Sequence, residues 1–329
     1  MSERVMILGV DVGGTNTRAA LFEAQRLRSP VWVCTAETQQ IPSFRDWLAR
    51  VVRDAGPVRA VGIGVAGPVF RGRSLTVNLP WVVDAAELRG ELGLPDLWVL
   101  NDLEAAAYGI LVLEPSDWVD LCSGRDEARG NRAVIAAGTG LGEAGLYWDG
   151  ADFHPFATEG GHASFSPTDD FGVELLQWLR RRFDHVSWER VLSGPGLKHV
   201  YDFLWERAEA GKQGPAPCST AEEIAARALE GRCPVCTAAM ERFACLYGSE
   251  AANLALKVMA VGGVYIAGTM AVQNRAFLEA DGFRQAFWSK GRMRPVVAVS
   301  PVRLVLLPEV GRCGAALRAL RGTRLATAG

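Results

Sequence analysis

The first residues in this sequence that could do chemistry are a carboxylate and a glycine turn near the N-terminus. Asp11 ends an apolar run and is followed by Gly13, Gly14, Thr15 and Asn16. Glycines allow backbone N–H groups to approach phosphate oxygens closely, and the Thr and Asn side chains add donors. A carboxylate beside such a turn suits Mg²⁺, which takes oxygen ligands and keeps several of its waters. We predict a phosphate-binding turn in which Asp11 holds Mg²⁺ through water.

A second glycine turn lies in the other half of the chain. Gly138, Thr139 and Gly140 follow the strand-like run 132–137, and a strand-like run resumes at 144–148. Because both turns lead into strands, neither fits the strand, turn and helix of a dinucleotide-binding motif. Each turn taken alone is also typical of a plain hairpin. Two such turns in matching halves favour a diverged duplication that holds ATP between its halves.

An acidic residue follows the strand-like run 97–100. Asn101 and Asp102 stand where this run ends and the helical pattern 103–112 begins. A carboxylate at that place can accept the proton of an attacking hydroxyl, which is the role of a base in phosphoryl transfer. Capping of the helix by Asn101 or Asp102 needs only the local backbone and is compatible with that role. We predict that Asp102 is the general base.

Residues of the kind that bind sugar hydroxyls are spread along the chain. Carboxylates and amides offer paired hydrogen-bonding atoms, and a closed site built from them can recognise hydroxyls. The candidates are Asn78, Glu159, His162 and Glu189. Each taken singly is also typical of a solvated residue, or for His162 of a structural histidine. A zinc site at His162 would need a cysteine cluster that does not follow it. We predict a small sugar as the phosphoryl acceptor.

The order of the elements predicts an α/β fold with mixed sheets. Strand-like runs at 5–12, 17–23 and 31–36 form an antiparallel meander, after which helical and strand-like stretches alternate. The second half begins in the same way. A chain of 329 residues is long enough for two packed domains.

Composition narrows the partners and the compartment. A net charge of -2 provides no broad positive field, so we expect neither nucleic acid nor an anionic membrane as a partner. The apolar run 5–10 is shorter than a signal-peptide core, and no later run spans a membrane, so we expect a cytoplasmic protein. Seven cysteines should then be reduced thiols. Cys233 and Cys236 lack a second pair at zinc spacing, which favours a helix opening there over a metal or redox site.

In these residues the chain resembles the bacterial ATP-dependent glucokinase family, of the hexokinase-type, actin-like ATPase superfamily. The resemblance covers nearly the whole chain and depends on an ordered set of motifs. These are DVGGTNTR at 11–18, VNLPW at 77–81, ND at 101–102, GTGLG at 138–142, EGGH at 159–162, ERVLSGPGL at 189–197, NLAL at 253–256 and GGVYIAG at 262–268.

The resemblance implies a two-domain actin-like (ribonuclease H-like) ATPase fold with mixed sheets and an interdomain cleft. Residues 1–108 and 309–329 would form a small α/β domain, and residues 109–308 a large α/β domain. Closure of the two domains on the sugar would exclude water from the transferred phosphoryl group. A homodimer follows by the same analogy.

The same resemblance implies a reaction and a set of contacts. Glucose would be the acceptor, its 6-hydroxyl the nucleophile, and ATP with Mg²⁺ the donor. The implied sugar contacts are Asn78, Asn101, Asp102, Glu159, His162 and Glu189. The implied strand and turn under the adenosine carry Gly262, Gly263 and Gly268.

Two residues depart from the family pattern. Thr269 stands where a second glycine is common, and Glu143 follows the second turn where an apolar residue is usual. A carboxylate aimed at phosphate would weaken binding, but alternation along a strand predicts that Glu143 points away. If both departures altered the nucleotide site, the donor would differ from ATP.

Other functions are also compatible with this sequence. A kinase for another hexose, or one that uses polyphosphate or ADP, would differ only in a few hydrogen bonds. A non-catalytic sugar sensor or repressor would need a DNA-binding extension, and Met1 lies too close to the first strand for one, so we expect none. A chaperone or filament ATPase would hydrolyse ATP without a sugar, so the polar residues in 159–162 would have no function in it.

Overall fold

The structure, a computed structural model, describes residues 4–75, 79–125, 129–208 and 217–327, with side chains described up to residue 323. The chain forms two compact units. Unit 1 comprises Met1–Trp118, Pro155–Ala157 and Leu307–Gly329, and unit 2 comprises Val119–His154 and Thr158–Leu306. The boundary expected after residue 108 would cut the end of a helix that packs within unit 1. The division into functional domains stays a prediction.

Unit 1 is built on a five-stranded mixed sheet with the order β3-β2-β1-β4-β7. Its strands are β1 (Met6–Val12), β2 (Asn16–Glu23), β3 (Trp32–Glu37), β4 (Ala60–Val65) and β7 (Leu97–Asn101). The first three form the expected antiparallel meander, and β4 and β7 continue the sheet in parallel with β1. Val12, Val65 and Asn101 stand side by side in this register. The first glycine turn and Asp102 therefore follow the carboxyl ends of β1 and β7, on the same side of the sheet as the end of β4.

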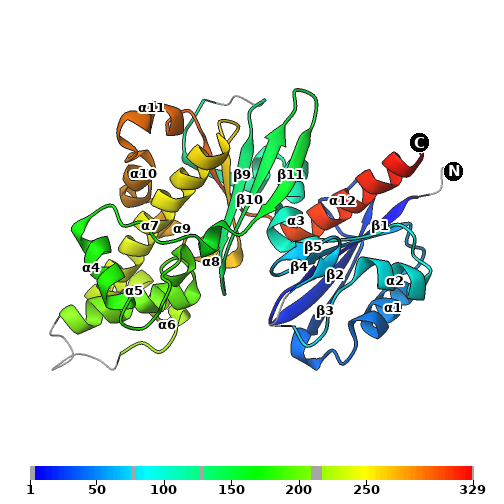
Figure 1. Cartoon of the computed structure of the whole chain (residues 1–329), viewed down its shortest axis with the longest axis horizontal. Helices are drawn as coiled ribbons and strands as arrows, with labels where there is room; N and C mark the ends of the chain where they lie inside the picture. Colours follow the sequence, from blue (N-terminus) through cyan, green and yellow to red (C-terminus); the bar gives the residue numbers. More distant parts are fainter. Residues whose placement is uncertain (1–3, 76–78, 126–128, 209–216, 328–329) are drawn as a thin grey trace. The chain divides into compact units, whose positions relative to one another are not determined.

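Helices cover both faces of this sheet (Figure 1). One face packs on α1 (Phe44–Ala55) and α2 (Ala85–Leu92), and the other on α3 (Asp102–Gly109) and α12 (Val310–Thr327). A β-carbon on Gly62 would lie 1.8 Å from the carbonyl oxygen of Ala315, so α12 comes this close only because β4 carries glycine there. The shorter elements are η1 (Thr38–Gln40), β5 (Val69–Phe70), β6 (Arg73–Ser74), η2 (Ile110–Val112) and η3 (Pro115–Asp117).

Unit 2 contains a six-stranded sheet with the order β11-β10-β9-β12-β13-β8. Its strands are β8 (Trp118–Cys122), β9 (Arg132–Ala137), β10 (Leu141–Trp148), β11 (Phe153–Thr158), β12 (Val264–Ala267) and β13 (Val302–Val305). β10 runs antiparallel to β9, and β12 runs parallel to both β9 and β13. The first five strands repeat the order of the unit 1 sheet, which agrees with the expected duplication.

A long helix, α7 (Pro234–Val258), packs at the centre of the helical part of unit 2. The neighbouring helices α5 (Gly194–Arg207), α6 (Ala221–Leu229) and α10 (Asp281–Trp288) pack along α7, which is the yellow ribbon in Figure 1. The helices of unit 2 are η4 (Gly160–His162), α4 (Asp170–Leu179), η5 (Trp188–Arg190), α5 (Gly194–Arg207), α6 (Ala221–Leu229), α7 (Pro234–Val258), α8 (Thr269–Gln273), α9 (Arg275–Leu278), α10 (Asp281–Trp288), η7 (Gly291–Met293) and α11 (Arg294–Val297). Among the described residues, no helix is both long and apolar enough to cross a bilayer.

Candidate active site

A buried threonine, Thr38, hydrogen-bonds to the backbone of the first glycine turn. The N–H of Gly13 donates to the carbonyl oxygen of Asn16 over 3.0 Å, which closes the turn. Thr38 Oγ1 donates to the carbonyl oxygen of Gly13 over 2.7 Å and lies 3.0 Å from Thr17 Oγ1. A β-carbon on Gly14 would meet nothing within 4 Å. The turn is therefore fixed on its inner side and open on its outer side, and sequence reasoning missed the role of Thr38.

Asp11 lies on β1 beside this turn, opposite Arg18 of β2. Its side chain is 35% exposed, and its carboxylate lies 4.0 Å from the Arg18 guanidinium. Burial raises the pKa of Asp11, while the charges of Arg18 and Arg312 lower it. One part-exposed carboxylate beside an open turn fits an ion that keeps most of its waters, such as Mg²⁺.

Asn101 and Asp102 have different tasks at the start of α3. Asn101 is buried and is the N-cap, because its Oδ1 accepts the N–H groups of Leu103 and Glu104 over 2.9 and 3.1 Å. Its Nδ2 donates to the carbonyl oxygen of Gly67 over 3.0 Å. Asp102 is half-buried at the first helical position, and its Oδ1 accepts the Leu103 N–H over 2.9 Å. Local bonds thus fix the orientation of the Asp102 carboxylate at the positive end of the helix dipole.

The second glycine turn is open on one side and meets a helix on the other. The Gly138 N–H donates to the Gly140 carbonyl oxygen over 2.8 Å, and Gly138 and Thr139 are exposed. The first residue of α5, Gly194, donates its N–H to the Gly138 carbonyl oxygen over 2.7 Å. Sequence reasoning missed this helix, although Ser193 before a Gly-Pro pair is a typical helix start.

Glu189 lies directly against the second glycine turn. Its Oε2 accepts the N–H of Leu141 over 3.0 Å, and a β-carbon on Gly140 would lie 2.6 Å from the same oxygen. The turn η4 packs on the same segment, because a β-carbon on Gly161 would lie 2.0 Å from the Leu141 carbonyl oxygen. Unit 2 therefore brings the residues 138–142, 159–162 and 189 into one packed group.

Glu159 and His162 project from the two ends of η4. Their side chains are 49% and 60% exposed, and His162 Nε2 lies 3.9 Å from Glu159 Oε2. The segment beyond them is tied to the segment before Glu189, because the Trp188 N–H donates to the Ala163 carbonyl oxygen over 3.0 Å. The predicted sugar residues of unit 2 therefore come from neighbouring segments.

The predicted sugar contacts fall into three groups. Asn78 lies outside the described residues. Asn101 and Asp102 belong to unit 1, whereas Glu159, His162 and Glu189 belong to unit 2. That both groups bind one sugar stays a prediction.

Only one of the three predicted adenosine-site glycines is exposed. Gly262 and Gly263 are buried, and a β-carbon on Gly262 would lie 2.3 Å from the Gly130 carbonyl oxygen. Gly268 is exposed after β12, with a φ of 98° that favours glycine. Thr269 is the first residue of α8 and has no positive φ, so its departure from the family pattern leaves the backbone unstrained.

Glu143 points into the interior of unit 2, as strand alternation predicted. The residue is only 1% exposed, and its carboxylate lies against Gly160 rather than on the open side of Gly138 and Thr139. This departure from the family pattern therefore places no charge on the exposed face of the turn.

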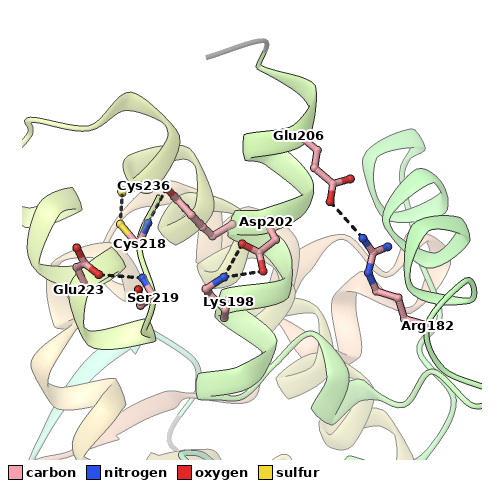
Figure 2. Close-up of polar contacts among 9 residues, drawn as sticks. Arg182, Lys198, Asp202, Glu206, Cys218, Ser219, Glu223 and Cys236 are labelled. Atoms are coloured by element: carbon pink, nitrogen blue, oxygen red, sulfur yellow. Dashed lines mark hydrogen bonds and ion pairs between the residues drawn. The ribbon is translucent and has the colours of Figure 1, made fainter. Parts of the chain in front are cut away.

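Cys233 and Cys236 open α7, one of the two roles considered for them. Cys233 is the N-cap, and its Sγ accepts the Cys236 N–H over 3.4 Å. Figure 2 shows the Cys236 Sγ beside that of Cys218, at 3.6 Å. All three side chains are buried, and burial raises the pKa of the Cys236 thiol. Within the part of the chain that the structure describes, no group of three or more His, Cys, Asp or Glu residues could hold a metal ion.

Comparison with known proteins gives one consistent result. A family model described as Glucokinase matches residues 8–321. A curated glucokinase of Nostoc punctiforme is 33% identical over 341 aligned positions, which cover 96% of this chain and 99% of the relative. A glucokinase crystal structure from an Antarctic psychrotroph has a TM-score of 0.84 and 30% identity, and covers 97% of this chain and 100% of its own.

A second solved structure extends this result. The glucokinase of Balamuthia mandrillaris, determined in complex with glucose, has a TM-score of 0.81 and 25% identity, over 97% of this chain and 94% of its own. The expected actin-like ATPase fold with mixed sheets is confirmed by these neighbours. The chain belongs to the glucokinase family and is a sugar kinase.

Proposed function

We propose that this chain is an ATP-dependent glucokinase that transfers the γ-phosphoryl group of ATP to the 6-hydroxyl of glucose. The observation that carries the proposal is the bond from the Leu141 N–H to Glu189 Oε2. Through this bond, a glycine turn suited to binding phosphate and a carboxylate suited to binding sugar hydroxyls lie in direct contact in unit 2. Membership of the glucokinase family supports the same assignment.

Asp102 is the general base of the proposed reaction. As the 6-hydroxyl oxygen attacks the γ-phosphorus, its proton passes to the Asp102 carboxylate and ADP leaves. The Leu103 N–H bonded to Asp102 Oδ1 and the Asn101 cap hold this carboxylate in one orientation. Correct orientation before the reaction supplies a large part of the rate enhancement in phosphoryl transfer.

The two glycine turns hold the phosphates of ATP. Residues 13–16 and 138–140 offer exposed backbone and side-chain donors, and the α5 N-terminus beside Gly138 adds a positive dipole end. Asp11 would hold hydrated Mg²⁺, which supplies neutralisation of the phosphate charge when bound. Gly268 is the position at which the backbone could approach the adenosine.

The sugar contacts that we propose are Asn78, Asn101, Asp102, Glu159, His162 and Glu189. Carboxylates that accept hydrogen bonds from neighbouring hydroxyls discriminate between sugar epimers, because the wrong epimer leaves a polar group without a partner. By analogy with the family, we further propose a cytoplasmic homodimer. Sedimentation velocity at micromolar concentration would show a single monomeric species if the dimer proposal is wrong.

A coupled assay of ADP release tests the proposed function. Glucose, mannose, fructose and N-acetylglucosamine are each supplied with ATP and Mg²⁺, and sugar phosphate formation from polyphosphate or ADP is followed in parallel. We expect the highest kcat/KM for glucose with ATP. Preference for another sugar or donor would reassign the substrate, and ADP release without any sugar would support an ATPase. Glucose binding without transfer would support a sugar sensor.

A further inference from the structure

Glu143 lies directly beneath the turn that carries Glu159 and His162. It is 1% exposed, and a β-carbon on Gly160 would lie 1.9 Å from its Oε2. The Thr158 hydroxyl donates to the Glu143 carbonyl oxygen over 2.9 Å, so the backbone of Glu143 is tied to the same turn. A shift of the Glu143 carboxyl would therefore move Gly160, and with it the two candidate sugar ligands on either side.

The Glu143 carboxyl also interacts with a second buried carboxyl, that of Glu250 on α7. Glu250 is fully buried, and it accepts hydrogen bonds from Asn253 Nδ2 over 2.7 Å and Lys257 Nζ over 3.0 Å. Lys290 Nζ donates to Asn253 Oδ1 over 2.7 Å and adds positive charge nearby. Glu143 Oε1, in contrast, is buried and has no hydrogen-bond partner among the described residues. The surroundings therefore stabilise a negative charge on Glu250 better than one on Glu143.

The charged and titratable groups around this pair agree on where the proton resides. Burial and the neighbouring Glu250 carboxylate together raise the pKa of Glu143 to about 8, against the opposing charge of Lys257. Burial also raises the pKa of Glu250, while Asn253 and Lys257 lower it. Tyr247, which is buried on the same helix, accepts the Ala137 N–H and carries no opposing charge. Other titratable groups close to the pair are Lys290, which donates to Asn253, and Glu159 and His162, which lie on either side of Gly160.

We propose that Glu143 is a positioning residue for the Glu159–His162 turn, and that it holds this turn as a neutral carboxylic acid that shares its proton with Glu250. The proposal rests on the proposed role of the turn in sugar binding. Loss of the proton would put two buried carboxylates side by side, with Lys257 hydrogen-bonded to Glu250. Because Gly160 is in close contact with Glu143 Oε2, repulsion would displace the turn and weaken glucose binding, whereas the two glycine turns would keep ATP.

The expected size follows from the population of the neutral form. A group with a pKa of about 8 is almost fully protonated at about pH 6.5, and only about one tenth remains protonated at about pH 9. If only the neutral form positions the turn, the dissociation constant for glucose rises about tenfold over this interval. The KM for ATP should change much less.

The test measures the pH profile of glucose binding and of the two KM values. The enzyme is compared with Glu143→Gln, whose amide donates to Glu250 as the acid does, and with Glu143→Val, which has no group to titrate. Glu241→Gln, an exposed residue on the same helix α7, is the control. We expect the alkaline rise of the glucose KM in the wild type and the control, and a flat profile in both Glu143 variants. An unchanged alkaline rise in Glu143→Gln would overturn the proposal.

If neither Glu143 variant folds, the wild-type glucose dissociation constant, measured by tryptophan fluorescence, decides alone: a constant value from about pH 6.5 to about pH 9 overturns the proposal, and a rise near tenfold supports it. Phosphorylation of glucose at neutral pH tests the proposed function separately. An active glucokinase with a flat wild-type profile would therefore refute only the role of Glu143.

Discussion

The N–H of Leu141 donates to Glu189 Oε2 over 3.0 Å, across 48 residues of sequence. The bond joins the second glycine turn to the carboxylate of η5, and it explains why the turn needs glycine at one position. A β-carbon on Gly140 would lie 2.6 Å from Glu189 Oε2, whereas one on Gly138 would meet nothing within 4 Å. The two glycines therefore have different surroundings. Gly138 faces open space, and Gly140 leaves room for the Glu189 side chain.

Gly140→Ala and Gly138→Ala should separate the two substrates. In Gly140→Ala the new methyl group displaces the flexible end of Glu189, so we expect the glucose KM to rise by roughly tenfold to a hundredfold, the cost of one charged hydrogen bond. In Gly138→Ala the methyl group enters the open side of the turn, so we expect the ATP KM to rise while the glucose KM stays within about twofold. Steady-state kinetics with each substrate varied in turn measures both. A similar change of the glucose KM in both variants would refute this division.

Asp102→Asn should keep the fold and lose the reaction. Asparagine can still accept the Leu103 N–H at the start of α3, so helix capping and glucose binding should remain. Its amide cannot take up a proton, and the loss of a general base typically lowers kcat by about two to four orders of magnitude. Glucose binding by fluorescence and turnover by the coupled assay are measured on the same preparation. Turnover near that of the wild type would show that another group accepts the proton.

Much of the fold could be predicted from local signals. The glycine turns between strands, the Asn-Asp pair at the start of α3 and the apolar runs each depend on a few neighbouring residues, and the structure has the corresponding elements. The helix expected over 103–112 ends as α-helix at Gly109 and continues as the 3-10 turn η2. The helices α5 and α10 and the strand β13 were not predicted, because their apolar residues face a core assembled from distant segments.

The side chains that hold the candidate site in place could not be predicted from the sequence, for the same reason. Thr38 reaches Gly13 across 25 residues, and Glu143 meets Glu250 only after the sheet and α7 have packed. The Glu143 side chain could be assigned to the interior from strand alternation, but nothing local indicates that a second carboxyl lies there. Long-range pairs of polar side chains carry no sequence period, so only the packed structure reveals them.

Thr38→Val should loosen the first glycine turn. Valine has nearly the same shape, but it removes the hydroxyl that donates to the Gly13 carbonyl oxygen and lies beside Thr17 Oγ1. A buried acceptor without its partner costs about 1–3 kcal/mol of the free energy of unfolding. We also expect the ATP KM to rise, because the turn loses its inner support. Urea unfolding and kinetics are compared with those of Thr35→Val, an exposed residue on β3. Equal stability of the two variants would contradict the assignment.

The buried acid Glu143 should make the free energy of unfolding depend on pH in a defined direction. The unfolded chain loses this proton near its ordinary pKa of 4.5, whereas the folded protein keeps it up to about 8. Between these values the folded state binds more protons, so the free energy of unfolding falls as the pH rises and levels off above the folded pKa. Relative to Glu143→Gln, the wild type should lose on the order of a few kcal/mol between about pH 5 and about pH 8.5. Urea unfolding at several pH values measures the difference, with Glu241→Gln expected to follow the wild type. Parallel profiles for the wild type and Glu143→Gln would show that Glu143 is already ionised in the folded protein.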